Sequence, residues 1–273
     1  MFDLTGQVAL VTGGSGVLGG AMAAGLLGAG AQVILLGRDE SRLAAAVEML
    51  AANDPERRSR LLAIPADVTD RESLAGASRT LRDSAGRLDI LVNAAGGNRP
   101  AATASPGQSF FGLPADALRE TIDLNLMGTI LPCQVLGQLM DAERGGSIVN
   151  VSSMAASRPL TRVVAYGAAK AAIENFTRWL AVYLAKEIGP TIRVNAIAPG
   201  FFIGEQNRAL LLDPATGALT ARGSAIIEHT PMGRFGEPAD LVGTVLWLAS
   251  AAAAFVTGVV VPVDGGFSAF GGV

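Results

Sequence analysis

The feature that most constrains the fold is the alternation of short apolar runs with longer Ala- and Leu-rich segments along 273 residues. The short runs, rich in β-branched residues, predict strands over 8–11, 33–36, 61–64, 90–92, 147–151, 193–197 and 259–263. Helical spacing of apolar residues predicts helices over 21–27, 41–51, 71–83, 115–141, 165–186 and 239–249. Apolar strands alternating with helices are typical of a parallel sheet covered on both faces. No linker or repeat divides the chain, so we expect a single α/β domain with a doubly wound sheet.

Composition limits the classes of partner. Half of the residues are hydrophobic and 16% are charged, which allows a large core. A formal net charge of −3 and a pI near 5.3 give no footprint for nucleic acid or an anionic membrane. The single cysteine, Cys133, excludes an internal disulfide, is expected in the core and suits a reducing cytoplasm.

Two segments bear on targeting. The start, Met1-Phe2-Asp3, lacks the basic and long apolar regions of a signal peptide. Residues 241–263 carry no formal charge and are long enough to span a bilayer. Because this segment contains Gly258 and Pro262, we expect a buried helix followed by a core strand. We therefore predict a cytoplasmic protein.

A glycine-rich segment, Thr12-Gly13-Gly14-Ser15-Gly16-Val17-Leu18-Gly19, follows the first predicted strand. Gly14, Gly16 and Gly19 match G-x-G-x-x-G between a strand and a helix, the context in which this pattern is informative. Backbone without Cβ can approach a pyrophosphate, and the helix N-terminus favours its negative charge. This predicts a dinucleotide site, although the glycines could also only close a tight turn.

The end of the second predicted strand, Gly37-Arg38-Asp39, bears on which dinucleotide binds. NAD sites usually place an acidic side chain here for the ribose 2′-hydroxyl. Gly37 leaves that place empty, and the Arg38 guanidinium suits a 2′-phosphate. We expect NADP, with NAD as the alternative because of Asp39; Arg38 could also be an ordinary surface residue.

Tyr166 and Lys170 stand four residues apart, which places a phenol and an ammonium on one helix face. A free tyrosine has a pKa of about 10, and a nearby cation favours its ionised form. Such a phenol could exchange a proton with a substrate oxygen that Ser153 holds by a hydrogen bond. Alone the pattern is weak, because many surface helices contain such pairs.

The sequence gives little support for a metal site or for a hydrolase triad. His229 is the only histidine, and its neighbours offer no metal-ligand spacing, so no metal site is expected. Ser153 has no partner histidine for a hydrolase triad. Hydride transfer is the chemistry for which the needed groups are present.

Together these motifs carry a family resemblance. The glycine segment, Asn125, Ser153, Tyr166 and Lys170, with Asn93-Ala94-Ala95-Gly96 and Pro199-Gly200, resemble the short-chain dehydrogenase/reductase family in order and spacing. The resemblance covers essentially the whole chain. It implies a seven-stranded parallel Rossmann sheet and hydride transfer between a nicotinamide and a carbonyl or secondary alcohol.

The resemblance also implies residue roles. Tyr166 would be the general acid or base, Lys170 would hold the nicotinamide ribose and lower the tyrosine pKa, and Ser153, rather than Ser152, would fix the substrate oxygen. Asn125 would bend its helix and hold a water that connects Lys170 to solvent. The cofactor would contact Gly13, Ser15, Gly16, Val17, Leu18, Gly19, Arg38, Asp67, Val68, Asn93, Ala94, Ala95, Gly96, Tyr166, Lys170, Pro199, Gly200 and Phe202.

Two positions depart from the family pattern. Val17 stands where the middle glycine usually falls, which affects the detailed phosphate contacts. Gly204 stands where many relatives place a threonine near the nicotinamide carboxamide, so that side-chain hydrogen bond is missing.

Several further segments, including Arg158-Pro159-Leu160-Thr161-Arg162 and Glu205-Gln206-Asn207-Arg208, resemble family members described as D-mannonate oxidoreductases. A sugar acid needs a cation for its carboxylate, and the candidates are Arg99, Arg158, Arg162 and Arg208. Its hydroxyls could be bound by Asn98, Gln206 and Asn207. The alternative for each arginine is that it forms an ion pair or faces solvent.

Long segments over 96–114 and 199–231 follow predicted strands, and such loops tend to bind substrates. We expect a substrate loop over 199–231. One rival enzyme class reduces 3-oxoacyl thioesters or other apolar ketones, with Phe110, Phe111, Phe201 and Phe202 lining the pocket. A nucleotide-binding sensor or scaffold without turnover is the alternative of another class. The apolar C-terminus and the resemblance favour a homotetramer.

Overall fold

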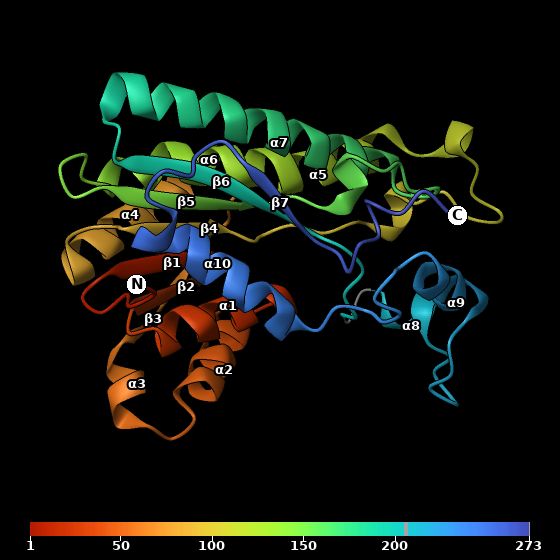
Figure 1. Cartoon of the computed structure of the whole chain (residues 1–273), viewed down its shortest axis with the longest axis horizontal. Helices are drawn as coiled ribbons and strands as arrows, with labels where there is room; N and C mark the ends of the chain where they lie inside the picture. Colours follow the sequence, from red (N-terminus) through yellow and green to blue (C-terminus); the bar gives the residue numbers. More distant parts are fainter. Residues whose placement is uncertain (205–206, 273) are drawn as a thin grey trace.

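The computed structural model describes residues 1–204 and 207–272 and contains one seven-stranded sheet, ordered β3-β2-β1-β4-β5-β6-β7, in which every pairing is parallel (Figure 1). This confirms the expected single doubly wound α/β domain. The strands are β1 (Val8–Thr12), β2 (Gln32–Gly37), β3 (Leu61–Pro65), β4 (Ile90–Asn93), β5 (Gly146–Val151), β6 (Ile192–Pro199) and β7 (Val260–Val263).

Helices cover both faces of this sheet. One face is packed by α1 (Val17–Gly28), α2 (Glu40–Ala51) and α10 (Val242–Ala249). The other is packed by α4 (Arg71–Ala85), α6 (Gly128–Val135) and α7 (Val164–Tyr183). Successive residues of β1 face opposite layers: Ala9 and Val11 belong to one core and Val8 and Leu10 to the other. Burial on both faces explains why the strands read as continuous apolar runs.

The predicted long helix over 115–141 is interrupted, which corrects that expectation. It divides into α5 (Ala115–Ile122), one π-helical turn (Asp123–Met127), α6 and a 3₁₀ turn (Gly137–Leu139). Inside the π turn, the Asn125 amide donates to the Thr121 carbonyl at 2.8 Å and the Thr129 hydroxyl donates to the Asn125 carbonyl at 2.8 Å. These side-chain bonds accompany the wider turn. π turns of this kind often occur at functional sites.

The uncharged segment 241–263 forms α10 and then β7, as predicted. The expectation of a core strand is not met, because β7 lies at the edge of the sheet and is only half-buried. None of the helices among residues 1–204 and 207–272 is long and apolar enough to cross a membrane.

Three short helices were not predicted: α3 (Pro55–Ser59), α8 (Arg208–Leu211) and α9 (Ala221–Glu228). Each is too short to show a helical repeat, and α3 and α9 depend on capping by Asp54 and Thr220. In Figure 1, α8 and α9 lie beyond the carboxyl ends of the strands, where open α/β sheets bind ligands.

Candidate active site

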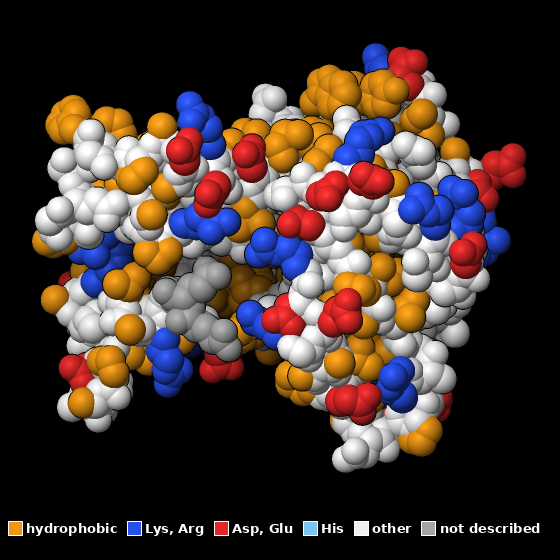
Figure 2. Space-filling view, turned by 180° about the vertical axis from the view of Figure 1, so that it is seen from behind, with side chains coloured by type: hydrophobic (Ala, Val, Ile, Leu, Met, Phe, Trp, Pro, Cys, Tyr) orange, Lys and Arg blue, Asp and Glu red, His pale blue; other side chains and the backbone are white. Residues whose placement is uncertain are grey.

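The surface is hollowed between the part that carries α1 to α3 and the part that carries α8 and α9, and basic and hydrophobic side chains border this hollow (Figure 2). Strands β1, β4, β5 and β6 are neighbours and parallel, so their carboxyl ends meet at one edge. The glycine-rich segment, residues 94–96, Ser153 and Gly200 follow these ends, and this edge therefore gathers motifs that are far apart in the sequence.

The glycine-rich turn between β1 and α1 is closely packed. Gly13 has a φ of +64°, and the Gly16 amide donates to its carbonyl at 2.9 Å. A Cβ on Gly19 would overlap that same carbonyl, and one on Gly13 would lie 3.0 Å from Ala95 backbone. The N-cap residue, Gly16, has no side chain to cap α1, so the first N–H groups of this helix suit an external anion. The turn fits a dinucleotide phosphate, and the exposed Val17 does not obstruct it.

The β4 segment is held to the same turn. The Thr12 hydroxyl accepts hydrogen bonds from the Ala94 and Ala95 amides, both at 3.1 Å. The Asn93 side chain is buried and donates to Asn150 at 2.9 Å and to the Cys133 sulfur at 3.2 Å. Asn93 therefore points into the core, and the backbone that follows it is what faces the site. Cys133 is buried, as expected, and burial raises the pKa of its thiol to about 12.

At the expected adenosine end, Arg38 is exposed and lies 3.7 Å from Asp67. Burial raises the pKa of Asp67, but hydrogen bonds from Thr69 and the Arg38 charge outweigh it and the net shift is downward. The Asp39 carboxylate is occupied at the start of α2, where it accepts from the Ser41 hydroxyl at 2.7 Å and the Arg42 amide at 3.0 Å.

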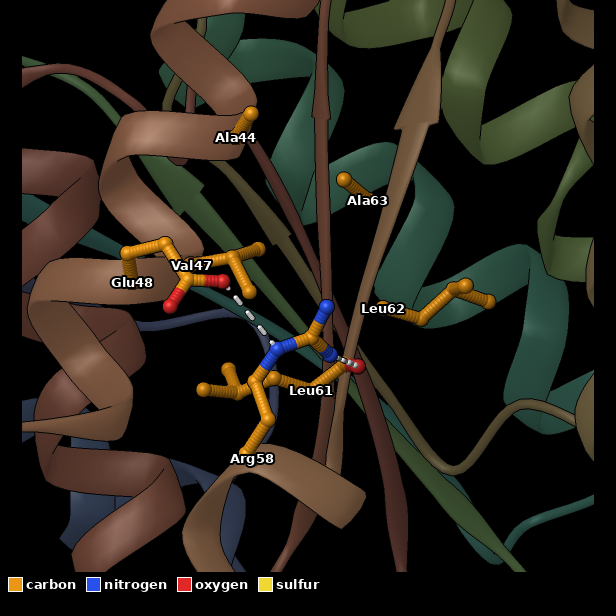
Figure 3. A pocket seen from close by; sticks show the side chains of 7 residues that line it. All are labelled: Ala44, Val47, Glu48, Arg58, Leu61, Leu62 and Ala63. Atoms are coloured by element: carbon orange, nitrogen blue, oxygen red, sulfur yellow. Dashed lines mark hydrogen bonds and ion pairs between the residues drawn. The ribbon is translucent and has the colours of Figure 1, made fainter. Parts of the chain in front are cut away.

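Val68 and a nearby cavity lie at this end of the site. Val68 is buried and packs against Gly128, because a Cβ on Gly128 would lie 2.9 Å from the Val68 side chain. A cavity of about 420 Å³ lies between Arg38, Arg99 and the π turn. A second cavity of about 280 Å³ lies at the sheet edge, where the Arg58–Glu48 ion pair joins α3 to α2 (Figure 3), and none of the predicted site residues lines it.

Tyr166 and Lys170 lie in the first two turns of α7 on one face, as their spacing predicts. The Lys170 ammonium is 5.5 Å from the centroid of the Tyr166 ring and donates to the Val151 carbonyl at 2.8 Å. Lys170 is buried, and desolvation lowers its pKa to about 7.

The direction of the Tyr166 pKa shift differs from the expected one. Burial raises the pKa of Tyr166, and a hydrogen bond with the Ser153 side chain opposes this shift without cancelling it. Sequence spacing indicates proximity to Lys170 but not the cost of burying a phenolate. Ser153 itself is buried and caps a 3₁₀ turn, where it accepts from the Ala155 amide at 3.2 Å.

Ser152 faces another direction. Its hydroxyl donates to Glu174 at 3.0 Å and to the Lys170 carbonyl at 3.3 Å. Of the two adjacent serines, Ser153 is the one bonded to Tyr166.

The Asn125 side chain ties the π turn to the loop after β4. It accepts from the Gly97 amide at 3.1 Å and donates to the Gly97 carbonyl at 2.7 Å. A Cβ on Gly96 would lie 2.7 Å from the Asn125 oxygen and 3.3 Å from the Lys170 ammonium. Asn125, Gly96 and Lys170 therefore lie close together.

The segment after β6 approaches closely too, since a Cβ on Gly200 would lie 2.7 Å from Asp264. The Phe202 ring is buried in the core against Gly236, so only its backbone is available to a ligand. Phe201 packs edge-to-face on Phe267 with ring centroids 5.2 Å apart. Phe110 and Phe111 are exposed and pack on each other. The four phenylalanines therefore pack against other parts of the chain or face solvent.

Some of the predicted substrate residues already have hydrogen-bond or ion-pair partners in the described chain, and others have none. Arg99 pairs with Glu120 at 3.1 Å, and Arg158 donates to the Ser268 carbonyl at 2.9 and 2.6 Å. Asn98 is bonded to Thr103, and Asn207 to the Phe202 carbonyl and the Gly204 amide. Gln206 lies outside the described residues.

Arg162 is half-buried and Arg208 exposed, and neither side chain has a hydrogen-bond or ion-pair partner within 1–204 and 207–272. Arg222 on α9 shares this property and was missed, because nothing in its local sequence marks it. The described residues contain no cluster of three metal ligands. The His229 ring hydrogen-bonds to the Ala225 carbonyl and packs on the Phe270 ring.

Comparison with known proteins identifies the family. A family model described as enoyl-(acyl carrier protein) reductase matches residues 14–268. The chain is 45% identical to an uncharacterized oxidoreductase, UxuB, of Bacillus subtilis, over 99% of this chain and 98% of that protein. It is 36% identical to the rhamnolipid-biosynthesis 3-oxoacyl-[acyl-carrier-protein] reductase of Pseudomonas aeruginosa, over 97% of this chain and 98% of the relative.

Two solved structures extend this likeness. A Haemophilus influenzae protein with bound NAD, described as a candidate D-mannonate oxidoreductase, superposes with a TM-score of 0.88 at 40% identity, over 99% of this chain and 98% of that one. The Pseudomonas aeruginosa RhlG/NADP complex has a TM-score of 0.85 at 34% identity, over 98% of each chain. The chain belongs to the short-chain dehydrogenase/reductase family of NAD(P)-dependent oxidoreductases.

Proposed function

We propose that this enzyme transfers a hydride between NADP and the carbonyl or secondary alcohol of a sugar acid, with D-mannonate and D-fructuronate as the pair. The observation that carries the chemistry is the placement of the buried Lys170 ammonium beside Tyr166, itself bonded to Ser153. The substrate pair is supported by the description of the Haemophilus structure.

Each chemical step has a residue suited to it. Nicotinamide, when bound, supplies or accepts the hydride at C4. In reduction, Tyr166 donates the proton that the substrate oxygen gains, and in oxidation it accepts the proton that the hydroxyl loses. Ser153 holds that oxygen by a hydrogen bond. Lys170 stabilises the phenolate when Tyr166 is ionised. Lys170, the glycine turn and Gly96 would also position the cofactor. Asn125 would hold a water that connects Lys170 to solvent for proton exchange.

Our assignment of NADP depends on the end of β2. Asp39 is committed to capping α2, so its carboxylate is not directed at a ribose hydroxyl. Arg38 is exposed, and its ion pair with Asp67 is long enough to give way to a 2′-phosphate. NAD is the alternative, because the Haemophilus structure holds NAD.

For the substrate, we assign residues 199–231 as the binding loop of a single dinucleotide-binding and catalytic domain. The rival, a 3-oxoacyl thioester, is favoured by the Pseudomonas aeruginosa relative. The four loop phenylalanines give this rival less support, because they pack against other parts of the chain or face solvent. The intact Ser153, Tyr166 and Lys170 favour turnover over a sensor or scaffold role.

The test is an initial-rate assay with D-mannonate and NADP or NAD at alkaline pH, followed by absorbance of the reduced cofactor. We expect turnover with NADP and a kcat/KM for D-mannonate well above that for D-mannitol. Acetoacetyl-CoA reduction with no activity on sugar acids would support the rival. Tight cofactor binding without turnover across sugar acids, polyols and thioesters would support the sensor.

We further propose a cytoplasmic homotetramer. Phe255 is fully exposed near the edge strand β7, and the rings of Trp179 and Tyr183 stack on the outer side of α7 with centroids 5.2 Å apart. Exposed apolar groups of this size suit subunit contacts. Light scattering coupled to size exclusion gives the mass directly, and a 27.8 kDa species would contradict the assembly.

A further inference from the structure

We propose that Arg162 and Arg222 bind the carboxylate of the substrate together, and that Arg222 is the residue that makes the enzyme select sugar acids over neutral polyols. This inference rests on the proposed sugar-acid function. It assigns to α9 a binding residue that the sequence motifs do not contain.

The first observation is the absence of counter-charges. Both side chains are half-buried, and neither forms an ion pair or hydrogen bond with any residue in 1–204 or 207–272. The nearby Asp264 carboxylate accepts from the Gly266 and Ser268 amides, both at 2.9 Å. Asp213 accepts from the backbone that follows it. These acids are therefore committed elsewhere.

The second observation is that the charge of Arg162 acts on Arg222. Burial, followed by the charge of Arg162, lowers the pKa of Arg222. Two like charges that are partly removed from water repel each other, and an anion between them relieves that cost. Arg222 also lies in the first turn of α9, whose first turn contains no acidic residue. The positive end of the helix adds to the same field.

The third observation is the position relative to the reacting groups. Arg162 is four residues before Tyr166, and its carbonyl accepts from the Ala104 amide at 2.9 Å, which ties the loop after β4 to this point. Arg222 lies on α9, in the segment that follows β6. The two arginines therefore come from different segments, and Arg162 directly precedes the helix that carries Tyr166.

The C-terminal segment 264–270 joins these two segments. Its Ser268 carbonyl receives the Arg158 guanidinium, and its Phe270 ring packs on His229 at the end of α9 with centroids 6.4 Å apart. The Met232 amide donates to the Gly265 carbonyl at 3.1 Å. These contacts connect the end of α9 to the loop that carries Arg162. No acidic side chain among residues 1–204 and 207–272 pairs with either arginine.

Chemistry favours a carboxylate as the occupant. Guanidinium groups bind planar two-oxygen anions through paired hydrogen bonds, and two arginines can hold both oxygens. Arg99 and Arg158, by contrast, are already bonded to Glu120 and Ser268. Among the predicted substrate arginines, Arg162 is thus the half-buried one without a partner in the described chain. Arg222 supplies the second guanidinium for the same carboxylate.

The test compares Arg222→Gln, Arg162→Gln and the double variant with wild type, and uses Arg82→Gln on the exposed face of α4 as the matched control. We expect each single change to raise KM for D-mannonate about 10- to 100-fold, with kcat changed less than about threefold. KM for D-mannitol and for NADP should not change. The double variant should lose less than the product of the single losses, because both arginines hold one group.

Binding without turnover gives a second readout. Calorimetric titration of D-mannonate into the NADPH complex of Tyr166→Phe, with and without Arg222→Gln, should show the same loss, and Arg222→Lys should recover part of it. Equal losses for D-mannonate and D-mannitol, or a loss confined to acetoacetyl-CoA, would overturn the assignment.

The two proposals can fail separately. If wild type does not oxidise D-mannonate, the proposed function is wrong, and titration of D-gluconate into the same variants decides on the arginine pair. Binding that Arg222→Gln weakens supports the pair, and binding that it leaves unchanged refutes it.

Discussion

The ammonium of Lys170 lies 5.5 Å from the centre of the Tyr166 ring, one helical turn away on α7. Lys170 is anchored to the Val151 carbonyl at the end of β5, so its position is set by the sheet as well as by the helix. Burial affects the two groups in opposite directions, lowering the pKa of Lys170 and raising that of Tyr166. Each group is thereby held away from its charged form.

The two adjacent serines provide a matched pair of variants. Ser153→Ala removes the hydroxyl bonded to Tyr166, and we expect kcat to fall about 100-fold or more. Ser152→Ala removes bonds to Glu174 and to the Lys170 carbonyl, and we expect about 1 kcal/mol lower stability with kcat within about threefold. Steady-state kinetics and urea unfolding measure both. Similar kinetic losses in the two variants would contradict the assignment.

The depressed pKa of Lys170 predicts how stability depends on pH. The folded state loses the lysine proton near pH 7, and the unfolded state keeps it until about 10.5. Between these values the unfolded state binds more protons, so the free energy of unfolding rises with pH. Relative to Lys170→Met, wild type should gain stability from pH 7 to 10, with a slope of at most about 1.4 kcal/mol per pH unit.

Urea unfolding of wild type and Lys170→Met at several pH values measures this difference. The variant keeps a long side chain but carries no ionisable group at the site. A constant difference between the two proteins from pH 7 to 10 would show that Lys170 titrates normally.

Cofactor choice can be tested at Gly37 and Arg38. A side chain at Gly37 meets no atom closer than 3.6 Å, so Gly37→Asp has room to place a carboxylate near a ribose hydroxyl. We expect Arg38→Leu to raise KM for NADP about 10- to 100-fold and Gly37→Asp to shift preference toward NAD. Asp39→Asn, which keeps the α2 cap, is the control and should leave the preference unchanged. An unaltered ratio in Arg38→Leu would exclude a role in selectivity.

Much of the fold could be predicted because a buried parallel strand needs apolar residues on both faces, as in β1 and β2. The break at Asn125 could not be located from periodicity, since its cause is a set of side-chain bonds to Thr121 and Thr129. Helix α9 and Arg222 were missed because eight residues are too few for a repeat.

The site was predictable to the extent that its residues follow strand ends or share a helix face, as Tyr166 and Lys170 do. Properties that depend on burial were not. Spacing indicated that Lys170 would lower the Tyr166 pKa, whereas the enclosure of the phenol raises it. The commitment of Asp39 to a helix cap likewise depends on where its backbone places it.

The most direct measurement compares Tyr166→Phe with wild type in single-turnover oxidation of D-mannonate by NADP. Loss of the phenol should slow the hydride step about 100- to 10,000-fold while calorimetry shows unchanged NADP binding. Hydride transfer at the wild-type rate, in a variant that is folded and saturated with both ligands, would show that Tyr166 does not carry the proton.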